Sequence, residues 1–193
     1  SRVVPNSFYN RVVYENFPSK SLKKEFSEVH FIDSKGLAIG REKIQTSEEI
    51  INFYHETAPD RTLPKCVTEA KYLINMPLLK RHPIQYGVTF SGKNLFGTWV
   101  ESVPPIHEYH TSGFISGNPA PQVDLLAHEQ LGGKTLIYIG DATFATKIDH
   151  HTIDKFQMDP FNNDRTNSLF FSEDPVAIDS AMYDFLHTEG TTP

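Results

Sequence analysis

The sequence predicts an α/β fold in which a largely parallel or mixed sheet is flanked by helices in layers. Short apolar runs rich in β-branched and aromatic residues recur along the chain, as expected of strands. Helical patterns lie between these runs, and such alternation is typical of layered α/β domains. The length of 193 residues is enough for one hydrophobic core, so we expect a single domain over residues 1–193.

Four apolar runs are the predicted strands, and polar or charged residues follow each of them. They comprise residues 29–32, 72–76, 135–139 and 169–171. In parallel sheets, ligands bind beyond the carboxyl ends of the strands because the loops converge there. The residues after these runs are therefore candidate site residues, among them Lys80, Asp141 and Asp174.

Two helices are predicted in the middle of the chain. The first begins at a Thr46 or Ser47 cap and runs through Tyr54, with Ile and Phe residues on its apolar face. The second spans residues 122–131 and ends at Gly132-Gly133, which is a typical stop signal.

The strongest helical pattern lies near the end of the chain. Asp174 is suited to cap it, and Pro175 is suited to the first helical position. The apolar face repeats at helical spacing and comprises Ile178, Ala181, Met182, Phe185 and Leu186. A structural role as cap is therefore the best explanation of Asp174, although its place after a strand also makes it a candidate ligand-binding residue.

The charges are distributed unevenly along the chain. The formal net charge is −6, yet residues 70–100 contain Lys71, Lys80, Arg81 and Lys93 and no Asp or Glu. Nucleic-acid binding needs a basic surface overall, whereas a local positive segment in an acidic chain suits a pocket for a small anion. We therefore expect a small anionic ligand as the partner, and no nucleic acid.

Four residues of this positive segment are candidates for the chemistry. Lys80 and His82 follow a strand and Pro77, and Lys93 and Asn94 fit a short helix. Two ammonium groups and an imidazole can hold a carboxylate or phosphate, and a lysine beside another cation can act as a base. We assign Lys80, His82 and Lys93 as candidate catalytic residues and Asn94 as a candidate ligand-binding residue. The alternative is that all four belong to a solvated surface.

Two acids complete the candidate site. Asp141 follows the third predicted strand, where it could orient a lysine, bind a metal or cap the next turn, and we count it with the catalytic candidates. Asp179 lies on the flank of the last apolar helix face, where a carboxylate needs a partner. Lys80 or Lys93 would be natural partners, so Asp179 is a candidate ligand-binding residue.

The metal-binding residue types form no complete site. His107 and His110 have a spacing that can share a metal ion, but no third ligand has a fixed spacing from them, so we predict no metal. We keep both as candidate ligand-binding residues, with exposed loop histidines as the alternative. Cys66 is the only cysteine, which excludes a cysteine-ligated iron–sulfur cluster within this chain, and we expect its side chain to be buried. The cofactor, compartment and oligomeric state stay unassigned.

Several motifs occur together in a defined order. They are Tyr72-Leu-Ile-Asn-Met-Pro-Leu-Leu-Lys80-Arg-His82, Val88-Thr-Phe-Ser-Gly-Lys93-Asn94-Leu-Phe-Gly97, His107 or His110, Ile139-Gly-Asp141 and Ser172-Glu-Asp174-Pro175-Val-Ala-Ile-Asp179. With this set, the chain resembles, from about Glu69 to Leu186, the family called domain of unknown function 362, whose members are often described as iron–sulfur-associated proteins. The resemblance supports the α/β fold and a site at these motifs. The ferredoxin-type cysteines of many members are absent, and so is the family's opening segment, so we expect this chain to be part of a longer protein.

These observations lead to one main functional expectation. We expect an enzyme-like domain that binds a small carboxylate or phosphate ligand at the carboxyl edge of the sheet, with Lys and His as acid–base groups. The alternative is a non-catalytic ligand-binding or accessory module of a larger assembly. The chain has no P-loop, no glycine-rich dinucleotide motif and no Gly-x-Ser-x-Gly elbow, which argues against nucleotide hydrolysis, a Rossmann dehydrogenase and a serine hydrolase. It also has no run of 18 apolar residues, so we expect no membrane span.

Overall fold

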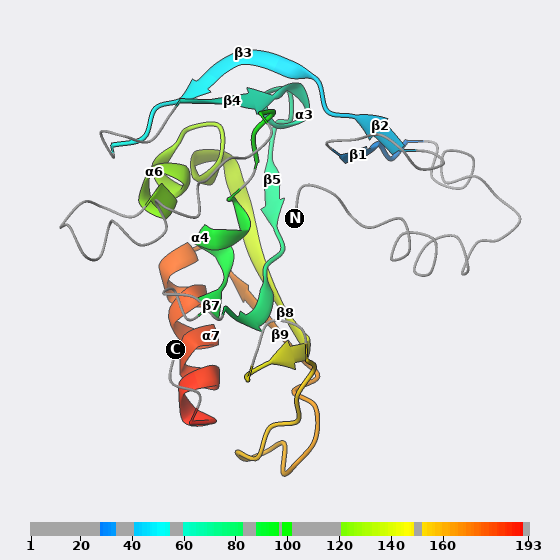
Figure 1. Cartoon of the computed structure of the whole chain (residues 1–193), viewed down its shortest axis with the longest axis vertical. Helices are drawn as coiled ribbons and strands as arrows, with labels where there is room; N and C mark the ends of the chain where they lie inside the picture. Colours follow the sequence, from blue (N-terminus) through cyan, green and yellow to red (C-terminus); the bar gives the residue numbers. More distant parts are fainter. Residues whose placement is uncertain are drawn as a thin grey trace, which may run out of the picture. The chain divides into compact units, whose positions relative to one another are not determined.

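The structure, a computed structural model, describes residues 28–33, 41–54, 60–82, 88–96, 98–101, 121–148 and 152–190 (Figure 1). The chain divides into two compact units, and each is described by itself below. Unit 1 comprises residues 1–50, 61–70 and 97–101, and unit 2 comprises residues 51–60, 71–96 and 102–193. A single domain over residues 1–193 stays a prediction.

The described part of unit 1 contains two small sheets and one short helix. Strands β1 (Phe31–Asp33) and β2 (Arg41–Lys43) pair in parallel. Strands β3 (Thr46–Ile51) and β4 (Arg61–Pro64) form the second pair, and helix α3 (Lys65–Thr68) follows β4 directly.

The helix predicted after Ser47 is wrong, because this segment is strand β3. The Ser47 hydroxyl donates a hydrogen bond of 2.7 Å to the Leu63 carbonyl of β4 instead of capping a helix. Thr46, Ile50 and Ile51 are β-branched and therefore suit a strand that has a partner. The local sequence is compatible with either a helix or a strand, and pairing with β4 selects the strand.

The prediction that Cys66 is buried is also wrong. Its side chain is exposed on α3, where Val67 is the buried residue. The surrounding protein still desolvates the thiol enough to raise its pKa, which disfavours the reactive thiolate at neutral pH.

The main sheet lies in unit 2 and is built around the long strand β8 (Thr135–Thr146). Strands β5 (Leu73–Asn75) and β6 (Leu78–Arg81) run parallel to β8, whereas β9 (Ser168–Ser172) pairs with β8 in antiparallel orientation. Strand β7 (Val88–Thr89) extends the sheet beyond β6, also antiparallel. The predicted α/β fold with a mixed sheet is confirmed.

Strands β5 and β6 lie one after the other along β8. Leu73 is opposite Thr135, and Lys80 is opposite Thr146. Between these strands, the Pro77 carbonyl accepts a hydrogen bond of 2.8 Å from the Asp141 amide. Lys80 therefore lies inside a strand and not in the loop that the sequence suggested.

Strand β8 also differs from its prediction, because it continues for seven residues past Ile139 to Thr146. The sequence suggested that Gly140 ends the strand, but this glycine provides space for a helix. A Cβ atom at Gly140 would lie 2.6 Å from the sulfur of Met182. Glycine within a strand is typical of such close approach. Asp141 is consequently a mid-strand residue.

Helix α7 (Pro175–Thr188) is confirmed, including its cap. The Asp174 carboxylate accepts hydrogen bonds of 2.7 Å and 3.1 Å from the amides of Val176 and Ala177. The helix packs on one face of the sheet through a core that joins Ile178, Met182 and Leu186 to Leu79, Phe90, Tyr138, Ala142, Ala145 and Phe156. Phe185, at the border of this core, packs edge-to-face on Phe170 with ring centroids 4.7 Å apart.

Two shorter helices lie on the same side of the sheet as α7 (Figure 1). They are α4 (Ser91–Asn94) and α6 (Pro121–Ala127), and a 3-10 turn, η2 (Gly132–Lys134), follows α6. The helix predicted over residues 122–131 is therefore shorter than expected. It ends because the His128 carbonyl accepts hydrogen bonds from the Leu131 and Gly133 amides, which turns the chain back toward β8.

The other face of the sheet carries apolar side chains that are about half exposed. In the register of the sheet, Phe171 is opposite Ile139, Leu169 is opposite Asp141, and these residues alternate with those that face α7. The exposed members are Ile74, Met76, Leu78, Leu169 and Phe171. No helix in the described part of the chain is long and apolar enough to cross a membrane.

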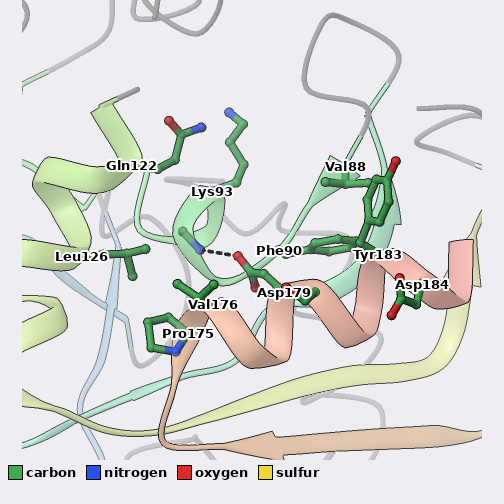
Figure 2. Close-up of a pocket in the computed structure, with 12 residues that line it drawn as sticks. Val88, Phe90, Lys93, Gln122, Leu126, Pro175, Val176, Asp179, Tyr183 and Asp184 are labelled. Carbon is green, nitrogen blue, oxygen red and sulfur yellow. Dashed lines mark hydrogen bonds between the residues drawn. The ribbon is translucent and has the colours of Figure 1, made fainter. Parts of the chain in front are cut away.

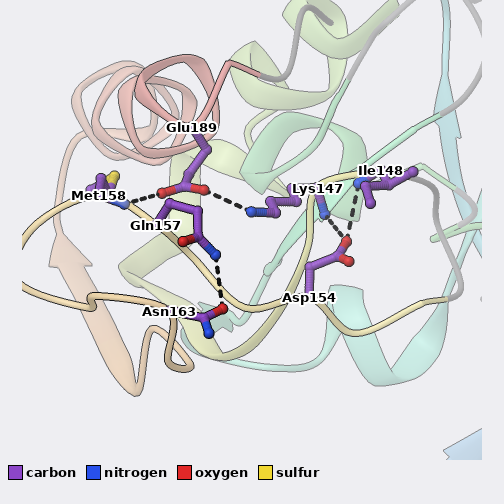
Figure 3. A network of polar contacts seen from close by, with 7 residues as sticks. All are labelled: Lys147, Ile148, Asp154, Gln157, Met158, Asn163 and Glu189. Atoms are coloured by element: carbon purple, nitrogen blue, oxygen red, sulfur yellow. Dashed lines mark hydrogen bonds and ion pairs between the residues drawn. The ribbon is translucent and has the colours of Figure 1, made fainter.

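A buried ion pair attaches the end of α7 to the segment after β8 (Figure 3). Lys147 Nζ lies 2.7 Å from Glu189 Oε2, and the other Glu189 oxygen accepts a hydrogen bond from the Met158 amide. The side chains are 14% and 1% exposed. Nearby, Asp154 accepts hydrogen bonds from the amides of Lys147 and Ile148. Glu189, at the end of α7, thus holds both Lys147 and Met158 of the segment between β8 and β9.

We predict that Met182→Ala lowers the free energy of unfolding by about 2–5 kcal/mol, because Met182 is completely buried between α7 and β8. Met76→Ala is the matched control, since that methionine is 59% exposed, and its effect should stay within about 0.5 kcal/mol. Urea denaturation measures both values. Similar losses in the two variants would contradict the described core.

We predict that Glu189→Gln costs about 1–3 kcal/mol near neutral pH, because it weakens the charge-assisted hydrogen bonds that Lys147 and the Met158 amide make with the carboxylate. Burial alone would raise the pKa of Glu189, but hydrogen bonds from Lys147 and from the Met158 and Gln157 amides outweigh it and lower the pKa below 4.5. The stabilisation is therefore present above pH 4.5 and is lost as the pH falls through the folded-state pKa.

Denaturant melts of the wild type and Glu189→Gln between pH 7 and pH 3 measure this effect. The difference between the two proteins should shrink in acid, and Glu173→Gln, at an exposed position, is the control. A difference that does not vary with pH would show that Glu189 contributes through packing and not through its charge.

Candidate functional site

A pocket of about 490 Å³ lies beside α4, α6 and α7 (Figure 2). All of its lining belongs to unit 2. The lining residues are Val88, Phe90, Gly92, Lys93, Gln122, Leu126, Pro175, Val176, Asp179, Ser180, Tyr183 and Asp184. Much of this wall is apolar, and a few polar groups interrupt it, which is the usual composition of a small-molecule site.

Helix α4 is positioned by a buried asparagine of β5. Asn75 is 4% exposed, and its Nδ2 donates a hydrogen bond of 3.0 Å to the Ser91 carbonyl. Its Oδ1 accepts a hydrogen bond of 2.7 Å from Asn94 Nδ2. Both ends of this short helix are therefore attached to the sheet. The sequence analysis missed Asn75, although a polar residue within an apolar strand is a signal that could have identified it.

Asp179 attaches α4 to α7. Its carboxylate accepts hydrogen bonds from the amides of Ser91, at 2.8 Å, and Gly92, at 3.3 Å. The bond from Gly92 is the dashed line in Figure 2. Burial raises the pKa of Asp179, although these hydrogen bonds act in the opposite direction. The partners that the sequence suggested, Lys80 or Lys93, are thus replaced by backbone N–H groups. Such contacts are formed only when two distant segments meet, so spacing cannot reveal them.

Lys93 provides the ammonium group of the pocket. Burial, together with the charge of Lys80, lowers its pKa from 10.5 to about 8. Its Nζ lies 4.6 Å from the centre of the Phe96 ring. Lys80 does not line the pocket, but its effect on Lys93 shows that the two charges interact. At neutral pH, Lys93 is therefore mostly charged, and it loses its proton more readily than an ordinary lysine.

Gln122 of α6 adds an unused hydrogen-bond acceptor. Its Oε1 is buried and has no hydrogen-bond partner among the described residues. A buried acceptor without a donor costs about 1–3 kcal/mol. Gln122 lines the pocket, so a rotation of its amide would present this oxygen to an N–H or O–H group of a ligand.

The other predicted residues do not line the pocket. Asp141 accepts hydrogen bonds from the amide and hydroxyl of Thr143, on the face of the sheet opposite to α7. Asp174 caps α7, and Asn94 binds Asn75. His82 is half-buried just after β6. His107 and His110 lie outside the described residues.

No metal site is found in the part of the chain that the structure describes. Within these residues, no three side chains of the types His, Cys, Asp and Glu lie close enough together to hold a metal ion.

Comparison with known proteins adds a family but no relative of known function. A family model named Domain of unknown function (DUF362) matches residues 40–184, which include the main sheet and most of α7. No curated protein and no solved structure matches the chain significantly.

We predict that Lys80→Met raises the pKa of Lys93 above about 8, because it removes the nearby positive charge. The pKa should stay below 10.5, since burial is the larger cause and is unchanged. Acetylation of Lys93 as a function of pH, followed by mass spectrometry, measures the shift. Lys155→Met is the control, because Lys155 is exposed and lies outside the pocket. Equal midpoints in Lys80→Met and the wild type would refute an interaction between the two lysines.

Proposed function

We propose a function for this chain, which belongs to the family Domain of unknown function (DUF362): it binds a small organic anion in the pocket beside α4, α6 and α7. A carboxylate or phosphate group contacts Lys93, and the rest of the ligand lies against the apolar wall. The observation that carries this proposal is an ammonium group in an otherwise largely apolar pocket, with a second lysine close enough to perturb it.

Electrostatics support an anion at this position. Placing two lysines near each other costs free energy, and a bound anion reduces that cost while it forms a charge-assisted hydrogen bond with Lys93. The surrounding residues 70–100 contain no acid, so no carboxylate of that segment competes for these charges. Asp179 and Asp184 also line the pocket. The oxygens of Asp179 are engaged by the α4 amides, and Asp184 lies on α7 beyond Tyr183, away from Lys93 (Figure 2).

The wall of the pocket favours an anion with an apolar body. Val88, Phe90, Leu126 and Val176 contribute aliphatic and aromatic surface. Burying apolar ligand surface contributes roughly 25 cal/mol per Å². A volume of about 490 Å³ is within the usual range of small-molecule sites.

Acid–base chemistry is consistent with the same site. With a pKa of about 8, Lys93 exchanges a proton near physiological pH and could serve as a general base for a bound carbonyl compound or carboxylic acid. The partner group that the sequence suggested, His82, is not part of the pocket lining, so the proposal depends on Lys93 alone.

A second function, that of an accessory module in a larger assembly, is favoured by the apolar face of the sheet. Ile74, Leu78, Leu169 and Phe171 are each more than half exposed, and contiguous apolar patches of this kind usually mark interaction surfaces. Phe171→Lys tests this function, because the charge should abolish any association that sedimentation velocity detects in the wild type. If the wild type sediments as a monomer and no other protein co-purifies with it, the accessory-module function is wrong.

Binding is tested by thermal stabilisation with benzoate, acetate and inorganic phosphate. Benzoate should raise the melting temperature most, because it combines a carboxylate with an apolar ring, and Lys93→Met should abolish the shift. Lys155→Met is the matched control and should respond like the wild type. A benzoate response that is equal in wild type and Lys93→Met would rule out Lys93 as the anion contact.

The pH dependence gives an independent check. Benzoate affinity should fall as the pH rises through about 8, because Lys93 loses its charge there. In Lys80→Met, this decline should begin at a higher pH, for the reason given above. Affinity that is constant between pH 7 and pH 10 would contradict a role for the ammonium group.

A further inference from the structure

We propose that Lys93 forms a Schiff base with the carbonyl group of a small aldehyde or ketone that binds in the pocket beside α4, α6 and α7. The inference rests on the proposed anion site and names the class of its ligand, a 2-oxo acid. The carboxylate of such a ligand lies beside its carbonyl group, so the protonated imine on Lys93 keeps the positive charge that the ammonium group provides. It assigns to Lys93 the role of a nucleophile.

The first support is the position of Lys93. Its side chain is half-buried and lines the pocket, and it originates from a helix that is held from two directions. Asn75 of β5 holds the carbonyl of Ser91, and Asp179 of α7 holds the amides of Ser91 and Gly92. A nucleophile on an anchored backbone keeps a defined position relative to a bound ligand, which lowers the entropic cost of the reaction.

The second support is the surroundings of the amine. A lysine becomes nucleophilic at neutral pH when it is desolvated or lies near another cation, and Lys93 satisfies both conditions. With a pKa of about 8, roughly a tenth of Lys93 is neutral at pH 7, compared with about 0.03% for an ordinary lysine. Lys80 supplies the cation but does not line the pocket, so it acts on the nucleophile and is not itself placed to react.

The reaction is balanced without an oxidant or a reductant. The lone pair of Lys93 Nζ attacks the carbonyl carbon, and proton transfer gives a neutral carbinolamine. The carbinolamine hydroxyl takes up a proton and leaves as water while the C=N bond forms, and the nitrogen returns one proton to the solvent when the imine is neutral. One carbonyl compound and one amine thus yield one imine and one water.

Gln122 narrows the ligand class further. Its buried Oε1 has no partner among the described residues, and a ligand hydroxyl or N–H near the carbonyl would satisfy it after rotation of the amide. The carbinolamine hydroxyl is a transient group of this kind. Gln122 is therefore a positioning residue in this proposal.

The experiment traps the imine by reduction. Wild-type protein is incubated at pH 7 with phenylpyruvate and sodium cyanoborohydride, and the modified lysines are identified by peptide mass spectrometry. We expect a single preferred adduct on Lys93, formed roughly tenfold faster than on the exposed Lys155. Lys80→Met should reduce this preference, and Lys155→Met should leave it unchanged. Benzoate, which lacks the keto group, should protect Lys93 from modification.

The outcomes separate the Schiff base from the anion site on which it rests. Modification spread evenly over the exposed lysines, while benzoate still stabilises the protein, would overturn the Schiff base and leave the anion site standing. A preferred Lys93 adduct without a benzoate response would support the nucleophile and overturn the anion contact. If neither effect is seen, both proposals are wrong. Because Lys80→Met leaves the pocket lining intact, its slower modification supports the proposal even if Lys93→Met fails to fold.

Discussion

The geometry of the pocket depends on the carboxylate of Asp179. It accepts two hydrogen bonds from the first amides of α4 and so connects that short helix to α7. A helix of one turn is not stable by itself, so α4 needs such tertiary contacts to keep its place. The cost of burying the charge appears as a raised pKa, and the two N–H groups offset part of it. Lys93 follows directly after this attachment point, which means that the same contact that holds the helix also places the amine.

Strand β8 has a comparable role for the whole of unit 2. It pairs with β5, β6 and β9, and its residues Tyr138, Ala142 and Ala145 form much of the surface on which α7 packs. Gly140 allows Met182 to approach that surface closely. The helix that carries Asp179 is thus located by apolar packing, and the polar contacts of the site depend on this packing. The same hydrophobic core therefore stabilises unit 2 and fixes the geometry of the pocket.

The two faces of the main sheet differ in a way that bears on function. One face of the sheet packs against α7, and the pocket lies on that side. The opposite face presents half-exposed apolar side chains. Asp141, which the sequence grouped with the lysines, lies on the second face and binds Thr143. The pocket and the exposed apolar face are therefore separate features of unit 2, and the two proposed functions use different surfaces.

The sequence alone determined the elements whose signals are local. These include α7 with its Asp174 cap, the strands near residues 73–75 and 168–172, the short helix at Lys93, and the acid-free segment that carries Lys80 and Lys93. Such features depend on periodicity, capping chemistry and composition, all of which act between near neighbours. They were enough for the fold class and for two residues of the pocket wall, Lys93 and Asp179.

Only the tertiary structure decided how these parts meet. It assigned residues 46–51 to a strand, extended β8 past Gly140, placed Asp141 on the face of the sheet away from the pocket, and gave Asp179 backbone amides as partners. For residues 46–51 and for Asp179, the deciding contact joins residues far apart in the chain, Ser47 with Leu63 and Ser91 with Asp179. A strand and a helix can have similar local patterns, and a carboxylate cannot indicate which donor it will meet. The energies that select one arrangement come from packing and hydrogen bonds that exist only once the chain has folded.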